Sequence, residues 1–138
     1  MDLKMDTNFL SSGITAFIDL LGFGGRVSCA ETTEDLSSIL DSLKFVRHEF
    51  NDSVEDDIKE LTAATYVAAS DSVIINLPLK SKISELTGEF DNIMNEITGF
   101  AYSQSQCVLK GIFLRGGIAQ GWWYKEKDLL VSQSMVNA

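Results

Sequence analysis

Short apolar runs alternate along the chain with longer segments in which apolar residues recur every three or four positions. Residues 14–21, 61–69 and 72–79 are apolar runs rich in β-branched or aromatic side chains, a composition typical of buried strands. Only Ser70 and Asp71 separate the second run from the third, which predicts the tip of a β-hairpin. The first half of the chain therefore contains three expected strands.

Two segments have the period of an amphipathic helix. The first runs to residue 50, with Thr32 or Thr33 as its expected N-cap, and the second covers residues 82–105. The acidic stretch NDSVEDD at residues 51–57 is predicted to be a solvated loop, since it lacks the twelve-residue ligand pattern of a calcium loop.

The last third of the chain is predicted to hold two strands, within residues 108–124 and 128–132, and the opening of a helix in residues 132–138. The order β-α-β-β-α-β-β matches an α+β, ferredoxin-like βαββαβ fold, an antiparallel-rich sheet with helices on one face. We expect residues 1–138 to form a single domain that is incomplete at its C-terminus.

Composition excludes several classes of function. The chain has 138 residues, 45% of them hydrophobic, and a net charge of −9, so it is not expected to bind nucleic acid or anionic membranes. Metal ions can still bring positive charge to an acidic nucleotide site. Cys29 and Cys107 lack metal-ligand spacing and are expected to be reduced thiols, and no signal peptide or membrane-length apolar run is present, which predicts a cytoplasmic protein.

Two acidic residues occupy positions where a carboxylate is costly or prominent. Asp19 lies inside an apolar strand, and Asp71 lies at the expected hairpin tip. If both reach the same sheet edge, a hard divalent cation such as Mg²⁺ or Mn²⁺ would relieve their repulsion, and two such ions suit phosphoryl-type transfer. The alternative is that Asp71 only forms the turn while Asp19 pairs with a basic residue.

Glycines and one arginine add candidate phosphate contacts. Gly22, Gly24 and Gly25 follow Asp19 and either expose backbone amides to phosphate or simply form a turn. Arg115, in GIFLRGGIAQG, either clamps a triphosphate or pairs with an acidic neighbour. The lone His48 is interpreted as a surface or helix-end residue.

Three of these segments, taken in order, resemble motifs of the class III nucleotidyl cyclases, the adenylate and guanylate cyclase superfamily. Residues 17–23, FIDLLGF, are similar to the family's F-x-D-(I/L)-x-G-F stretch, Ser70-Asp71 to its G-D hairpin, and residues 114–121, LRGGIAQG, to its glycine-rich arginine strand. The residues of these motifs most resemble those of the bacterial pyrimidine cyclases of Pycsar antiphage defence.

The resemblance implies roles for individual residues. Asp19 and Asp71 would bind two Mg²⁺ or Mn²⁺ ions, assisted by the Leu20 carbonyl. The backbone amides of Phe23 and Gly24 would hold the β- and γ-phosphates. Arg115 would contact phosphate as a third catalytic residue.

Base recognition departs from the adenylate pattern. Enzymes of that type carry a lysine four residues before the second aspartate, and here that position is Val67, beside Tyr66. This departure speaks against adenine and leaves Tyr66 as a candidate reader of a pyrimidine, although strand alternation favours Val67 on the face of Asp71. Asn137 is the candidate for the family's transition-state asparagine. Alignment of Ser132 with the family's glycine, however, places Val136 at that position instead.

The resemblance implies conversion of CTP or UTP to cyclic CMP or cyclic UMP and pyrophosphate, as a second messenger in antiphage defence. A separate effector would respond to the cyclic nucleotide without direct contact. A head-to-tail homodimer is expected, with Trp122, Trp123 and Tyr124 as interface candidates or as ordinary packing residues. The alternatives are a purine cyclase and a catalytically inactive cyclase fold that senses nucleotide or mediates dimerisation.

Overall fold

A five-stranded antiparallel sheet forms the centre of the protein. The computed structural model describes residues 11–127 and 129–137. The strand order is β2-β3-β1-β4-β5, and every neighbouring pair is antiparallel. The strands are β1 (Ser11–Leu20), β2 (Thr65–Ala69), β3 (Ser72–Pro78), β4 (Leu114–Glu126) and β5 (Leu129–Ser132). The predicted α+β, ferredoxin-like arrangement is confirmed, with β5 added at the edge of β4.

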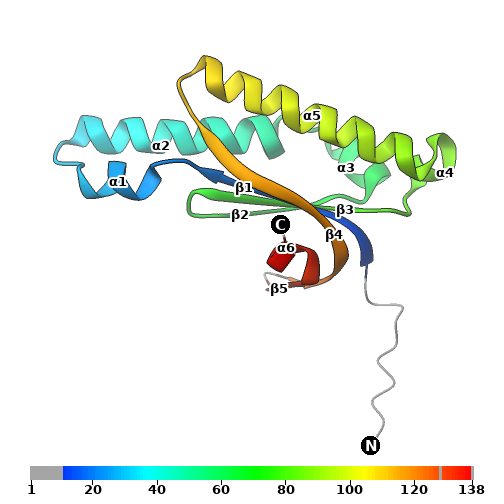
Figure 1. Cartoon of the computed structure of the whole chain (residues 1–138). Coiled ribbons are helices and arrows are strands. Elements are labelled where there is room, and N and C mark those ends of the chain that lie inside the picture. The colour runs from blue at the N-terminus through cyan, green and yellow to red at the C-terminus, as the bar shows by residue number, and fades with distance from the viewer. Residues whose placement is uncertain (1–10, 128, 138) are drawn as a thin grey trace, which may run out of the picture.

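Two long helices cover one face of this sheet, and one short helix lies on the other (Figure 1). The helical segments are α1 (Phe23–Ser28), α2 (Thr33–Arg47), the π-helical turn η2 (His48–Asp52), α3 (Asp56–Thr62), α4 (Lys82–Thr87), α5 (Glu89–Leu109) and α6 (Gln133–Asn137). Both α2 and α5 lie on the same side, as predicted. The expectation of helices on one face is wrong for α6, which packs beneath β4 and β1.

The start of α2 is fixed by a reciprocal cap. The Thr32 hydroxyl accepts a hydrogen bond from the Asp35 amide at 3.1 Å, and the Asp35 carboxylate accepts one from the Thr32 amide at 3.0 Å. This capping box satisfies amides that the first helical turn leaves unpaired. The expected cap at Thr32 is therefore confirmed.

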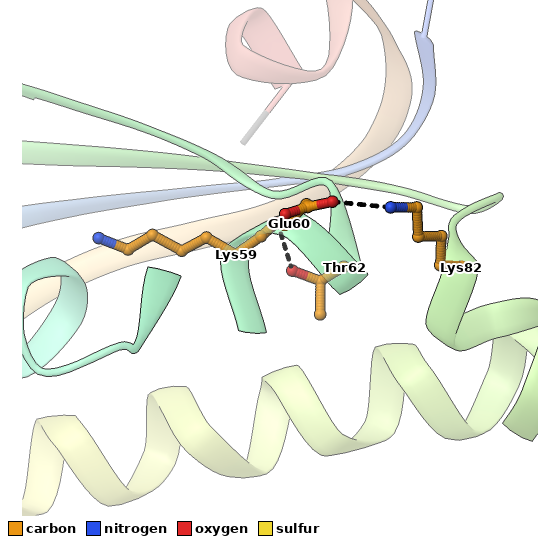
Figure 2. A network of polar contacts seen from close by, with 4 residues as sticks. All are labelled: Lys59, Glu60, Thr62 and Lys82. Carbon is orange, nitrogen blue, oxygen red and sulfur yellow. Dashed lines mark hydrogen bonds and ion pairs between the residues drawn. The ribbon is translucent and has the colours of Figure 1, made fainter. Parts of the chain in front are cut away.

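The acidic segment at residues 51–57, predicted to be a loop, is partly helical. A π-helical turn continues through Asp52, and α3 begins at Asp56, because acidic residues stabilise the first turn of a helix. Since α3 runs to Thr62, β2 begins at Thr65 rather than at residue 61. Figure 2 shows how α3 is tied to the start of α4 by an ion pair of 2.8 Å between Glu60 and Lys82.

The second predicted helix is interrupted. Gly88 adopts a φ of 95°, which favours glycine, and it separates α4 from α5. The α5 helix then continues to Leu109, beyond the expected end at residue 105. Apolar periodicity does not reveal such a break because apolar residues recur at helical spacing on both sides of Gly88.

The core lies between the sheet and the helices α2, η2 and α5. Alternation along β1 sends Ala16 and Leu20 into it. The buried residues of this cluster are Ala16, Leu20, Val46, Phe50, Val73, Ile75, Cys107 and Ile112. The intervening β1 positions, including Thr15 and Asp19, face the opposite side of the sheet.

A buried polar network holds α6 on that opposite side. Thr15 donates to Asn76 Oδ1 at 2.7 Å and shares a short hydrogen bond with Ser134, and the Ser134 hydroxyl also bonds Ser132 at 2.8 Å. A Cβ atom on Gly121 would lie 2.9 Å from the Ser134 amide nitrogen, so the missing side chain lets α6 approach β4 closely. This network places α6 on the sheet face that also carries Asp19.

Candidate active site

Asp19 lies near the end of the central strand, between two strands that supply partners. The antiparallel registers place it opposite Ser72 of β3 and Arg115 of β4. Its side chain is only 8% exposed, whereas that of Arg115 is 69% exposed. A buried carboxylate therefore meets one hydroxyl and one solvent-facing guanidinium at the same edge of the sheet.

Both oxygens of the Asp19 carboxylate accept hydrogen bonds. Arg115 Nε donates to Oδ2 at 2.7 Å, and the Ser72 hydroxyl donates to Oδ1 at 3.1 Å. Burial raises the pKa of Asp19, but the bonds from Arg115 and Ser72, together with an interaction with the Asp71 side chain, outweigh it. The net pKa of Asp19 lies below its usual value, so the group is an anion at neutral pH.

The hairpin between β2 and β3 brings Asp71 to Asp19. Ser70 and Asp71 form its two-residue tip, as predicted, with Ser70 in the left-handed region at a φ of 53°. The Leu20 amide donates to the Asp71 carbonyl at 3.1 Å, which joins the tip to the end of β1. Arg47 Nη2 donates to the Ser70 carbonyl at 3.2 Å and supports the tip from α2.

The oxygens at this edge suit a hard divalent cation. They are the carboxylates of Asp19 and Asp71 and, by the resemblance, the Leu20 carbonyl. Within residues 11–127 and 129–137, no group of three or more histidine, cysteine, aspartate or glutamate side chains gathers around a point. Mg²⁺ is commonly held by one or two carboxylates, with waters and substrate phosphates completing the shell, so this donor set fits it.

The glycine segment after Asp19 forms a helix, not an open turn. Gly22 is the N-cap of α1 and has a φ of 77°, and Phe23 and Gly24 begin the helix. The first turn of α1 has no side-chain cap and no acidic residue. A simple turn, one of the two alternatives, does not describe these glycines, because Gly24 and Gly25 lie within α1, where Gly24 is exposed.

The two residues considered for base recognition lie on opposite faces of the sheet. Tyr66 packs against the helix-side core, away from the Asp19 carboxylate. Burial raises the pKa of Tyr66 to about 12, with a further contribution from the negative charge of Glu96. Val67 pairs with Ile74 and shares the face of Asp19, as strand alternation favoured.

The remaining candidates have mixed positions. Asn137 ends α6, but its side chain is outside the part that the structure describes. Trp123 is 3% exposed and lies over Gly13, which makes it a core residue and not an interface residue. Trp122 and Tyr124 remain exposed on the same strand.

Sequence reasoning missed two contributors to the site. Ser72 directly follows the hairpin tip, so pairing of β3 with β1 would have placed it beside Asp19. Arg47 reaches the tip from the end of α2, 23 positions before Ser70, and no local pattern marks it. A cavity of about 180 Å³ is lined mainly by apolar residues of β1, β4 and α5, and Arg115 is also part of its lining.

Comparison with known proteins yields a likeness to solved structures alone. No family model matches the chain, and no curated protein matches it. Among solved structures, it is similar to the adenylyl cyclase CyaB from P. aeruginosa, with 14% identity, a TM-score of 0.43, and coverage of 93% of this chain and 68% of that chain. A similarity of this strength does not identify a family. Among the described residues, no helix is long and apolar enough to cross a membrane.

Proposed function

We propose that this protein is a metal-dependent nucleotidyl cyclase that acts on a pyrimidine nucleoside triphosphate. The observation that carries the proposal is the meeting of Asp19, Asp71 and Arg115 at one sheet edge. These are the three positions that the resemblance to class III cyclases assigns to cation and phosphate binding. The chain order of the motifs and the ferredoxin-like topology support the same assignment.

The proposed reaction is intramolecular. The ribose 3′-oxygen bonds to the α-phosphorus while the bond to pyrophosphate breaks, and the 3′-hydroxyl proton is released. Asp19 and Asp71, with the Leu20 carbonyl, would hold Mg²⁺ or Mn²⁺, which lowers the pKa of the 3′-hydroxyl and neutralises phosphate charge when bound. Arg115 and the Phe23 and Gly24 amides would orient the triphosphate, because positioning and charge neutralisation dominate phosphoryl transfer.

The pyrimidine assignment rests on the β2 strand. Val67, not Tyr66, shares the sheet face of Asp19, so we assign the base-facing position to Val67. An uncharged side chain there lacks the lysine that reads adenine in enzymes of the adenylate type. Cyclic CMP or cyclic UMP made by this site would serve as the second messenger of antiphage defence, acting on a separate effector. The site would be completed in a head-to-tail homodimer, with Trp122 and Tyr124 as contact candidates.

The test offers ATP, GTP, CTP and UTP separately to the protein with Mn²⁺ or Mg²⁺ and identifies products by mass. We expect cyclic CMP or cyclic UMP, with turnover reduced about 100-fold or more in Asp19→Asn and Asp71→Asn. Asp57→Asn, an exposed acid in α3, is the matched control and should keep full turnover. Cyclic AMP or cyclic GMP would overturn the base assignment while keeping the reaction class.

One observation favours a second candidate, a catalytically inactive cyclase fold that binds nucleotide. Ser72 and Arg115 already satisfy both oxygens of Asp19 without a cation. Nucleotide binding by calorimetry with no cyclic product from any of the four triphosphates would select this candidate. Product formation that depends on Asp19 would exclude it.

A further inference from the structure

The Asp19–Arg115 contact joins two groups that the proposed function assigns to different ligands. Asp19 is assigned to a cation and Arg115 to a phosphate, yet Arg115 Nε lies 2.7 Å from Asp19 Oδ2. We infer that Arg115 is an exchangeable counter-ion, which neutralises Asp19 in the empty site and competes directly with a divalent cation for Oδ2. This inference rests on the proposed cation site.

The competition follows from distances and charge. Mg²⁺ binds carboxylate oxygen at about 2.0–2.1 Å, so a cation on Oδ2 would be adjacent to the guanidinium. Two positive groups on one oxygen repel each other strongly where water is scarce, and the Asp19 side chain is 8% exposed. The other oxygen accepts a hydrogen bond from the Ser72 hydroxyl at 3.1 Å and belongs to the same carboxylate, so a cation bound there would still share its negative charge with the Arg115 guanidinium.

Arg115 is able to leave. Its side chain is 69% exposed, and within the described residues its only hydrogen bond is the one through Nε. The terminal nitrogens of Arg115 are therefore available to donate hydrogen bonds to a phosphate oxygen while Nε still contacts Asp19. Since arginine binds phosphate in a two-pronged manner, an arriving triphosphate would draw the guanidinium away from Asp19. Cation and triphosphate would then strengthen each other's binding, as linkage between sites requires.

The first arm measures Mn²⁺ affinity by calorimetry without nucleotide. A charge-assisted hydrogen bond with one exposed partner lies at the weak end of its class, so we expect Arg115→Gln to tighten Mn²⁺ binding roughly tenfold. The matched control is Arg26→Gln, which removes a guanidinium that donates to the Ser42 hydroxyl at 3.0 Å and to the Ser38 hydroxyl at 3.2 Å, both on α2. It should change the affinity less than about twofold. Equal gains in both variants, or none in Arg115→Gln, would overturn the inference.

The second arm reverses the exchange. In a chelator and without cation, Asp19→Asn should bind CTP or UTP more tightly than the unaltered protein, because it frees Arg115 from its ionic partner. Asp71→Asn removes a nearby charge but not that partner, and its gain should be clearly smaller. Equal gains in the two variants would show a simple charge effect and would overturn the exchange.

A direct spectroscopic readout does not depend on any variant. NMR of nitrogen-bound protons can follow the Arg115 Nε proton directly. Saturating Mg²⁺ should remove the protection of this proton from exchange with solvent. A proton that stays protected at saturation would overturn the inference. If no cation binds the unaltered protein or Arg115→Gln, the proposed cation site fails and the inference fails with it. If Asp71→Asn abolishes Mn²⁺ binding but Arg115→Gln does not tighten it, only the inference fails.

Discussion

Asp19 and Arg115 occupy paired positions on neighbouring antiparallel strands, and the Arg115 Nε donates to Asp19 Oδ2 at 2.7 Å. The two residues are 96 positions apart in sequence, so only the sheet joins them. Hydrogen bonds to the ionised form of a carboxyl lower its pKa, and this bond offsets part of the increase in the pKa of Asp19 that burial causes. The pair therefore links the proposed chemistry to the stability of the fold.

The first prediction concerns the pH dependence of that stability. Because the folded pKa of Asp19 lies below its unfolded value of about 3.9, its contribution is present above that pH and is lost as pH falls through the folded pKa. Urea unfolding at a series of pH values should show that the gap between the unaltered protein and Asp19→Asn shrinks as the solution becomes more acidic than about pH 4. A stability difference that stays constant over this pH range would contradict the lowered pKa of Asp19 in the folded protein.

The second prediction concerns the network beneath α6. Thr15→Val keeps the shape of the side chain but leaves Asn76 Oδ1 and Ser134 without this partner, which should cost about 1–3 kcal/mol of unfolding free energy. Thr98→Val is the control, because the Thr98 hydroxyl donates to the Met94 carbonyl on an exposed helix surface and has no other hydrogen bond among the described residues. Its effect should lie within about 0.5 kcal/mol. Urea midpoints with unchanged slopes would measure both, and equal losses would show that the buried network adds nothing specific.

The third prediction contrasts two glycines. A Cβ atom on Gly13 would lie 2.0 Å from the Leu77 carbonyl oxygen and 2.8 Å from the Trp123 ring, so Gly13→Ala should lose about 3 kcal/mol or more. Gly99 lies inside α5 with open space around it, and Gly99→Ala should gain about 0.5–1 kcal/mol from helix propensity. Thermal unfolding of the two variants checks both signs. A tolerated Gly13→Ala would contradict the close approach of β1, β3 and Trp123.

The fourth prediction concerns Tyr66. With its pKa raised to about 12, mainly by burial, the neutral phenol stabilises the folded state fully below its unfolded pKa of about 10, and this contribution is lost as pH rises from there toward 12. Tyr66→Phe should remove the tyrosinate absorbance step near pH 12 and flatten the decline of stability in that range. Retention of that step in Tyr66→Phe would place the titrating group elsewhere. Cyclase turnover should change little, because Tyr66 packs on the helix side of the sheet.

Much of the architecture could be predicted because local patterns determine it. The alternation of strand-like runs and helical periods gave the element order, Thr32 marked the start of α2, and two residues between two strands indicated the tip at Ser70 and Asp71. Local patterns failed where two signals compete. In the acidic stretch at residues 51–57, polarity suggested a loop, yet acidic residues also favour the first turn of a helix, and α3 forms.

By itself, the sequence determined which residues have chemistry that a phosphate or cation site needs, because Asp19 within an apolar strand is costly wherever the strand lies. It left open whether Arg115 has an acidic partner within the chain, and only the register of β1 against β4 identified that partner as Asp19. The tertiary structure also placed Tyr66 on the sheet face opposite Asp19 and buried Trp123. Strand alternation assigns each side chain to one of two faces, and the packing of helices decides which positions on each face are buried. Contacts between residues far apart in sequence depend on that packing, and no local pattern contains it.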